Sequence, residues 1–275
     1  MQSEEKTCQV IPLRITMSEV ETLLPNGRGV WVPIDHGVSE YPTEGIENLE
    51  ELISKLVEGG ADAIVAQKGV VSHYGHLHEG HMIAHLSVST RHAGKDSSNK
   101  ILVGSVEESL RRGAAGVSVQ VNMGSRNEAA MIERLGSVSN DCHRLGVPLL
   151  GMIYPRGKYL SIIDGDDTGG AAHAARLAFE LGCDVVKTKW TGDAISFSKV
   201  CQAVPIPVLI AGGPSGSDVE ETLSMVFEAI QAGGAGVCMG RQVFSNPHPE
   251  KMVKALRAIV HDGCDVSEAI SIAGL

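Results

Sequence analysis

ELGCDVVKTK, residues 180–189, is the stretch that decides how this chain folds. It begins as the end of a helix, continues through a glycine that can cap that helix, and runs into a buried parallel strand over Asp184–Thr188. Lys187 places a cation inside that strand. Because burial disfavours a charged amine, we expect a lowered pKa for Lys187 and an amine that can attack a carbonyl carbon. In the alternative reading the strand ends near Val186 and both of its lysines are solvated.

The same succession of helix, glycine and short β-rich run recurs along the chain, for example in EGGADAIVAQ (58–67) and QAGGAGVCMGR (231–241). Such alternation implies right-handed crossovers and a parallel sheet. We predict eight strands, near Val30–Ile34, Ala63–Ala66, Met82–Leu86, Gly116–Val121, Pro148–Ile153, Asp184–Thr188, Pro207–Ala211 and Gly236–Met239.

Eight strands favour one α/β domain over residues 1–275, a single (β/α)8 TIM barrel with a short N-terminal extension, residues 1–28, that covers the barrel floor. Residues 91–100 form the most loop-like insertion. An open doubly wound sheet is the rival fold, and it would be expected to show a G-x-G-x-x-G fingerprint after its first strand. This chain has DHGVS (35–39) at that place.

Composition narrows the class of protein. The chain has 275 residues, of which 43% are hydrophobic and only 4% aromatic, and it carries a formal charge of −10. That charge argues against nucleic-acid and anionic-membrane partners and favours a small molecule. Since we find neither an apolar signal core nor a run approaching the roughly 18 residues of a membrane span, we expect a soluble, cytoplasmic protein. The six cysteines lack a C-x-x-C pair and are expected to be reduced.

Reactive residues of a (β/α)8 enzyme lie at the carboxyl ends of its strands, so polar residues that end the apolar runs are the candidates. Glycines follow the seventh and eighth strands at Gly212-Gly213 and Gly240-Arg241. Their backbone N–H groups can approach a phosphate, and Arg241 can pair with it. The substrate is therefore expected to be phosphorylated. Further candidates for substrate contacts at strand ends are His36, Arg156 and Lys189.

Three side chains are candidates for catalysis: Lys187, Tyr154 and Asp35. Lys187 and Lys189 are two residues apart, so each would lower the pKa of the other if both face the barrel interior. Tyr154 could carry a proton to and from substrate oxygen, and Asp35 could act as a second acid/base or bind a hydroxyl. Taken singly, Tyr154 could equally be an ordinary strand-end phenol and Asp35 a helix N-cap.

A histidine-rich run raises the alternative of a metal-dependent enzyme. In such an enzyme a bound ion would stabilise an enediolate in place of an iminium on lysine. The run shows no H-E-x-x-H spacing, and glycines surround it, so we expect a loop beside the mouth of the site with one or two histidines touching substrate. Its members are His73, His76, His78, Glu79, His81 and His85. A second rival is a non-catalytic phosphate-binding barrel, which would keep the glycine loops and lose Lys187 or Tyr154.

Five motifs in the same order and phase resemble the archaeal-type class I aldolase family (DeoC/LacD-like). They are IDHGVS (34–39), YPRGK (154–158), DVVKTKWTGD (184–193), AGGP (211–214) and MGR-x-x-F (239–244). The resemblance runs from about residue 29 to about residue 269. It implies a (β/α)8 barrel whose Lys187 forms a Schiff base with a phosphorylated ketone, with Tyr154 as acid/base, and it implies neither a metal nor another cofactor.

Within that family, VPIDHGVS (32–39) and the match through VVKTKWTGDAISF are more similar to the heptulosonate synthases than to fructose-bisphosphate aldolase, whose first motif typically continues as EHGP. This implies transfer of a three-carbon ketose phosphate unit to L-aspartate semialdehyde. Fructose-1,6-bisphosphate cleavage, and direct condensation of dihydroxyacetone phosphate with aspartate semialdehyde, stay open as alternatives. Lys189 departs from the uncharged residue expected there, and it could tune Lys187 or contact the acceptor's carboxylate. The resemblance also implies a ring-shaped homo-oligomer such as a decamer.

Overall fold

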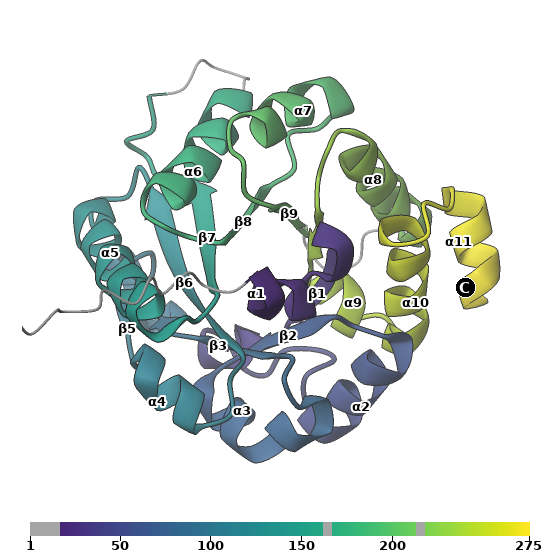
Figure 1. Cartoon of the computed structure of the whole chain (residues 1–275), viewed down its shortest axis with the longest axis horizontal. Helices are drawn as coiled ribbons and strands as arrows, with labels where there is room; N and C mark the ends of the chain where they lie inside the picture. Colours follow the sequence, from purple (N-terminus) through teal and green to yellow (C-terminus); the bar gives the residue numbers. More distant parts are fainter. Residues whose placement is uncertain (1–16, 162–166, 213–217) are drawn as a thin grey trace, which may run out of the picture.

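The computed structural model describes residues 17–161, 167–212 and 218–275. Eight strands form a closed parallel barrel in the order β1, β2, β3, β6, β7, β8, β9, β10 (Figure 1). This confirms the (β/α)8 prediction and excludes the open doubly wound sheet. The strands are β1 (Gly29–Pro33), β2 (Ala63–Ala66), β3 (Met82–His85), β6 (Gly116–Met123), β7 (Leu149–Pro155), β8 (Val185–Lys189), β9 (Val208–Ala211) and β10 (Gly236–Cys238).

Helices surround the barrel as an outer ring in Figure 1. The ring is built from α2 (Leu49–Gly59), α3 (Lys68–Tyr74), α4 (Val106–Arg111), α5 (Glu128–Leu145), α6 (Thr168–Glu180), α7 (Ala194–Gln202), α8 (Val219–Gln231) and α10 (Pro249–Val260). The remaining helical elements are α1 (Met17–Leu23), α9 (Arg241–Phe244), α11 (Val266–Ala273) and the short 3-10 turns η1 (Pro25–Gly27), η2 (Asp35–Val38), η3 (Gly75–His78) and η4 (Arg91–Asp96). Within the described ranges no helix is both long and apolar enough to cross a membrane.

Side chains alternate between two apolar layers along each strand, as the two-residue period of a strand requires. On β8, Val186 joins the layer between sheet and helices, whereas Val185 joins the layer inside the barrel. Lys187 has the same phase as Val185 and therefore enters the barrel. The interior layer consists of Leu23, Leu24, Trp31, Ala63, Val65, Ile83, Leu150, Met152, Val185, Leu209 and Cys238.

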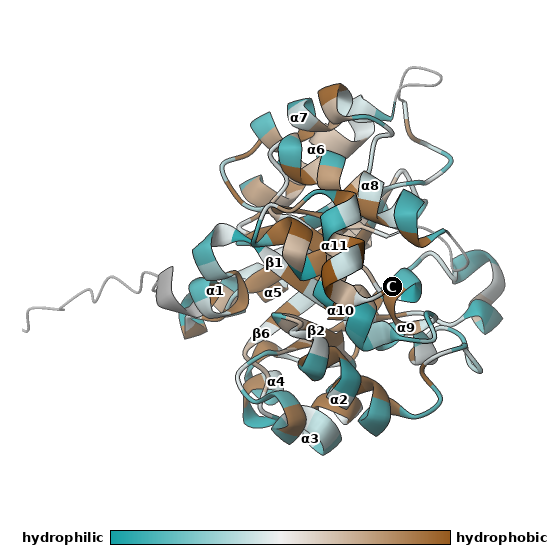
Figure 2. Ribbon diagram, turned by 90° about the vertical axis from the view of Figure 1, so that its right-hand side faces the viewer, coloured by the Kyte–Doolittle hydropathy of each residue, from teal (hydrophilic) through white to brown (hydrophobic). Residues whose placement is uncertain are grey.

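One end of the barrel is closed by α1 and the turn after it. Leu23 and Leu24 are buried in the interior layer, and the indole Nε1 of Trp31 donates a hydrogen bond of 2.6 Å to the carbonyl of Leu23. Figure 2 shows α1 and α9 at opposite ends of the barrel. Residues 1–16 of the expected floor cover lie outside the described residues, so the cover as a whole stays a prediction.

The insertion at residues 91–100 contains more structure than expected. Two short strands, β4 (Ser87–Val88) and β5 (Ile101–Leu102), pair antiparallel at its base, and η4 lies between them. Strands of two residues carry no hydrophobic period, so the sequence pattern could not reveal them.

A buried carboxylate joins β1, β2 and α10 at the amino end of the barrel. Asp62 accepts a hydrogen bond of 2.7 Å from the backbone N–H of Val30, one of 2.9 Å from Arg257 and one of 2.7 Å from His261. Arg257 also donates to the carbonyl of Gly60 at 2.8 Å. One short side chain thus satisfies three donors, which lie on β1 and at the end of α10 and are distant from Asp62 in sequence.

We predict that Asp62→Ala lowers the free energy of unfolding by about 3 kcal/mol, because it leaves buried donors and a cation without their partner. Urea unfolding followed by circular dichroism measures the change. Asp141→Ala, which breaks an exposed pair with Arg144, is the matched control and should cost about 0.5 kcal/mol or less. Equal losses in the two variants would contradict the role of Asp62.

Candidate active site

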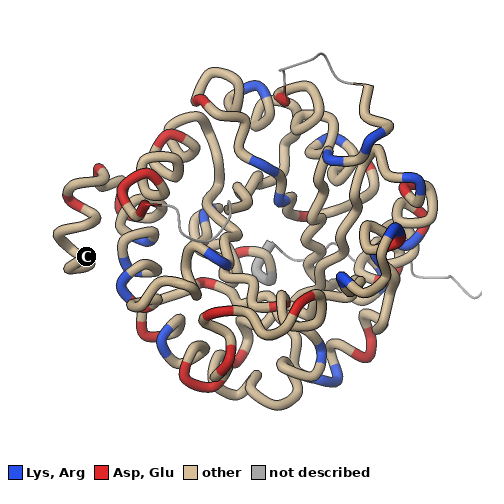
Figure 3. The backbone as a smooth tube through the Cα atoms, turned by 180° about the vertical axis from the view of Figure 1, so that it is seen from behind, with Lys and Arg blue, Asp and Glu red and all other residues tan. Residues whose placement is uncertain are grey.

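The carboxyl ends of the strands enclose a cavity of about 210 Å³, which we call the reaction cavity. Its lining comes from six of the eight barrel strands or the loops directly after them. Figure 3 shows basic positions within the ring of helices, whereas most acidic positions lie on the ring itself. The predicted site residues in its wall are Asp35, His36, Tyr154, Arg156, Lys187, Gly212, Gly240 and Arg241. Gly213 lies outside the described residues.

Lys187 lies on β8 between Met152 of β7 and Leu209 of β9 and is only 7% exposed. This rules out the reading in which the lysine is solvated at the strand mouth. Its amine interacts with the Tyr154 hydroxyl and the Cys238 thiol. Among the described residues, no carboxylate lies within 4.0 Å of it as an ion pair.

The pKa of Lys187 is raised, so the prediction of a lowered value is wrong. Burial by itself disfavours the ammonium, but Cys238, Tyr154 and the Asp35 carboxyl oppose burial and hold the pKa above its usual range. Because burial raises the pKa of the Cys238 thiol, Asp35 is the neighbour expected to carry negative charge near neutral pH. The Lys187 ammonium must therefore lose a proton before the resulting amine can attack a carbonyl carbon.

Lys189 does not share these surroundings. Its side chain is 31% exposed and forms an ion pair with Asp167, directly before α6. It is absent from the described wall of the reaction cavity and from the charges that act on Lys187. The predicted lowering of the Lys187 pKa by Lys189 is therefore not found.

Asp35 sits between two histidines. Its carboxylate lies 3.7 Å from Nε2 of His85 and 3.5 Å from Nδ1 of His36, and no hydrogen bond from its side chain caps a helix. Burial raises the pKa of Asp35, but His85, His36 and Lys187 more than offset this and leave it below its usual value. The group is thus a carboxylate near neutral pH.

His85 is the histidine of the run that reaches the site. It is buried at the end of β3, its Nδ1 lies 2.8 Å from the Ser118 hydroxyl, and burial lowers its pKa to about 4. His78 and His81 instead precede β3, where their rings bond the carbonyls of Ala61 and Asp62 at the amino end of the barrel. The run therefore does not converge, and within the described ranges no group of three or more His, Cys, Asp or Glu could hold a metal ion.

The glycines after β9 and β10 lie in close contact with their neighbours, and at Gly240 the neighbour is backbone. A Cβ on Gly240 would lie 2.6 Å from the carbonyl oxygen of Pro33, and one on Gly212 would lie 2.0 Å from Oε1 of Gln242. That Oε1 is buried without a hydrogen-bond partner in the described structure. Gln242 had not been predicted as a site residue, and nothing in its sequence position singles it out.

Two further polar residues reach this side of the barrel from β6. Gln120 donates to Asn122 at 2.9 Å, and Nε of Arg156 donates to the same amide oxygen at 2.9 Å. The Arg156 guanidinium also lies 4.5 Å from the centre of the Tyr154 ring. The alternation Ser118, Gln120, Asn122 along a buried strand was a signal that the sequence reading overlooked.

Comparison with known proteins places the chain among aldolases. A family model described as DeoC/LacD family aldolase matches residues 30–246. The chain is 40% identical over 246 residues to a 2-amino-3,7-dideoxy-D-threo-hept-6-ulosonate synthase of Halobacterium salinarum, covering 89% of this chain and 91% of that protein. It is 41% identical over 233 residues to a 2-amino-4,5-dihydroxy-6-oxo-7-(phosphonooxy)heptanoate synthase of Streptomyces griseus, covering 84% of each.

Solved structures agree with this placement. An archaeal fructose 1,6-bisphosphate aldolase has a TM-score of 0.80 and 28% sequence identity, covering 91% of this chain and 100% of that chain. A structure described as a Schiff base forming fructose-1,6-bisphosphate aldolase has a TM-score of 0.80 and 27% identity, covering 90% and 100%.

The electrostatics around Lys187 predict how its reactivity depends on pH. We expect single-turnover borohydride trapping of dihydroxyacetone phosphate to speed up as pH rises and the ammonium deprotonates. Asp35→Asn should move that rise to lower pH by about one unit, because the variant removes a negative charge that holds the pKa up. Asp167→Asn, which frees Lys189, should leave the profile unchanged. A shift in the control alone would contradict this assignment.

Proposed function

The chain belongs to the DeoC/LacD family of aldolases and is an enzyme of the class I aldolase type, and from that premise we propose that it joins a phosphorylated ketose unit, held as a Schiff base on Lys187, to L-aspartate semialdehyde. The observation that carries the proposal is a buried amine inside the barrel that shares the wall of a small cavity with a phenol. A non-catalytic phosphate-binding barrel would not need that pair.

Each residue has a proposed part in the reaction. The Lys187 amine, once deprotonated, attacks the ketone carbon, and loss of water from the carbinolamine gives an iminium. Removal of a proton from the adjacent carbon gives an enamine, whose carbon bonds to the aldehyde carbon while the aldehyde oxygen takes up a proton. Water then releases the product and restores the amine. Tyr154 is the proposed proton carrier, and the Asp35 carboxylate stabilises the cationic iminium.

The phosphate of the ketone is assigned to the β9 and β10 side of the cavity. Arg241 is exposed there and has no ion pair among the described residues, and Gly212 and Gly240 leave the backbone accessible. A phosphate would bring to Arg241 the negative charge that it lacks. His36, between this side and Asp35, is a further proposed contact.

The acceptor is inferred from the relatives at about 40% identity. The Streptomyces product, by its name, carries an amino group and a carboxylate at one end of a seven-carbon chain and a phosphonooxy group at the other. Reversing an aldol addition between its carbons 4 and 5 gives dihydroxyacetone phosphate and aspartate semialdehyde. The fructose-bisphosphate aldolases are 27% and 28% identical, so cleavage of that sugar is the second candidate.

The substrate assignment is tested by product formation with dihydroxyacetone phosphate, and separately with 6-deoxy-5-ketofructose 1-phosphate, as donors. Each donor is offered aspartate semialdehyde or glyceraldehyde 3-phosphate. A higher kcat/KM with aspartate semialdehyde supports the proposal. A higher value with glyceraldehyde 3-phosphate would make the enzyme a sugar-phosphate aldolase and leave the Schiff-base step intact.

Lys187→Ala is predicted to abolish both turnover and borohydride trapping while the barrel stays folded, because the outward-facing Val186 and Thr188 keep their packing. Lys187→Met, which fills the same space, should behave alike and guards against a folding defect. Lys189→Ala is the matched control and should still trap ketone. Turnover by Lys187→Ala together with loss of trapping in Lys189→Ala would reverse the assignment.

Tyr154→Phe is predicted to retain Schiff-base trapping and to lower kcat by roughly 10²–10⁴, since proton transfer is lost while the amine remains. Rapid-quench measurement of trapping beside steady-state turnover separates the two steps. An unchanged kcat would refute the proton-transfer role, and so would a variant that no longer traps ketone at any pH.

A further inference from the structure

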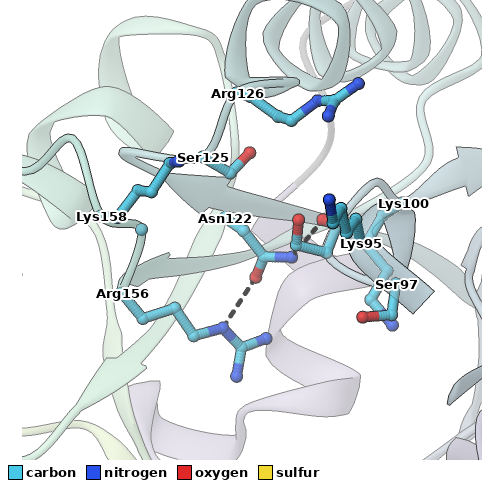
Figure 4. A pocket seen from close by; sticks show the side chains of 10 residues that line it. Lys95, Ser97, Lys100, Asn122, Ser125, Arg126, Arg156 and Lys158 are labelled. Atoms are coloured by element: carbon cyan, nitrogen blue, oxygen red, sulfur yellow. Dashed lines mark hydrogen bonds between the residues drawn. The ribbon is translucent and has the colours of Figure 1, made fainter.

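A second pocket, of about 610 Å³, adjoins the reaction cavity, and we call it the basic pocket. Arg156 lines both, and the hydrogen bond from Gln120 to Asn122 joins their walls. Figure 4 shows the cationic side chains of the basic pocket arranged around Asn122. Those side chains are Lys95, Lys100, Arg126, Arg156 and Lys158.

The charge of this pocket is unbalanced. Five cations line it and no carboxylate does among the described residues, in a chain whose formal charge is −10. Within the described parts of the chain, Arg126 alone among these cations has an ion pair, 3.7 Å from the exposed Asp96. Burial, and next the proximity of Arg156, lower the pKa of Lys100. Cations that face one another without an anion are best explained by an anionic ligand.

The pocket is held in place by contacts of the insertion between β4 and β5. The carbonyl of Ser98 accepts a hydrogen bond of 2.7 Å from Asn122 of β6. Arg134 of α5 donates at 2.8 Å to both the Asn99 side chain and the carbonyl of Lys100. The backbone at Lys100 is therefore held by α5, on the side where Asn122 also orients Arg156.

Strand order places the basic pocket and the proposed phosphate loops on opposite sides of the nucleophile. The pocket is built on β6 and on the end of β7, the loops follow β9 and β10, and Lys187 lies on β8 between them. An enamine on Lys187, with its phosphate at Arg241, would thus meet an acceptor arriving from the β6 and β7 side.

We propose that the basic pocket binds the anionic end of the acceptor aldehyde, a carboxylate or a phosphate, through Lys100, Arg156 and Lys158. This inference rests on the proposed function, and it names the residues that determine acceptor specificity. An uncharged aldehyde leaves these cations unsatisfied and gains nothing from them. Lys189, held by Asp167, is not needed for this contact.

The test compares acceptors in the variants Lys100→Met and Lys158→Met. Glyceraldehyde 3-phosphate and uncharged glyceraldehyde form a matched pair, and aspartate semialdehyde represents a carboxylate. Each variant should raise KM for charged acceptors about tenfold or more, while kcat/KM for glyceraldehyde and KM for the ketose phosphate stay unchanged. Lys254→Met, on the exposed face of α10, is the control and should change nothing.

Equal losses with glyceraldehyde and with the charged acceptors would overturn the proposal, since they indicate a structural effect. Unchanged KM values in both variants would overturn it as well. A larger effect on aspartate semialdehyde than on glyceraldehyde 3-phosphate identifies the natural group as a carboxylate, and the reverse identifies a phosphate. Borohydride trapping of ketone reports separately on the proposed function, because its absence from the wild type would refute the Schiff base and not the pocket.

Discussion

The structure depends on keeping one ammonium, that of Lys187, inside an apolar barrel. Burying a cation is costly unless polar groups replace the water it loses. Tyr154 and Cys238 supply polar groups, and the Asp35 carboxylate supplies negative charge. Asp35 is in turn held by His85 and His36. These groups stabilise the buried ammonium of Lys187, and they also surround the position at which an iminium would form. The same side chains would therefore stabilise both the resting amine and the cationic intermediate.

The geometry of the barrel brings together short segments that are far apart in sequence. Each strand contributes one or two inward side chains at its carboxyl end, and the parallel register brings Met152, Lys187 and Leu209 to the same level. Acidic positions elsewhere in the chain lie mostly on the outer ring of helices (Figure 3). The chain is thus acidic as a whole and basic around its reaction cavity, a distribution that would attract an anionic ligand to the strand ends.

The sequence predicted the barrel because each of its eight strands is a short apolar run, and several of these runs follow a glycine near the end of a helix. It also predicted that Lys187, Tyr154 and Asp35 would meet, since residues at strand ends converge in any such barrel. It failed where the outcome depends on long-range partners. The direction of the Lys187 pKa shift is set by residues on three other strands or their ends, and Lys189 pairs with Asp167 from the far side of α6 in the sequence. Gln242 and the contacts that fix Lys100 likewise arise only in the folded chain.

The most direct test of this account is to locate the covalent adduct in the unmodified enzyme. The protein is incubated with dihydroxyacetone phosphate, reduced with borohydride, digested, and sequenced by tandem mass spectrometry across the peptide that contains both Lys187 and Lys189. The account predicts the mass of a reduced three-carbon phosphate on Lys187, with Lys189 unmodified. An adduct on Lys189, or turnover without any trapped lysine, would contradict it.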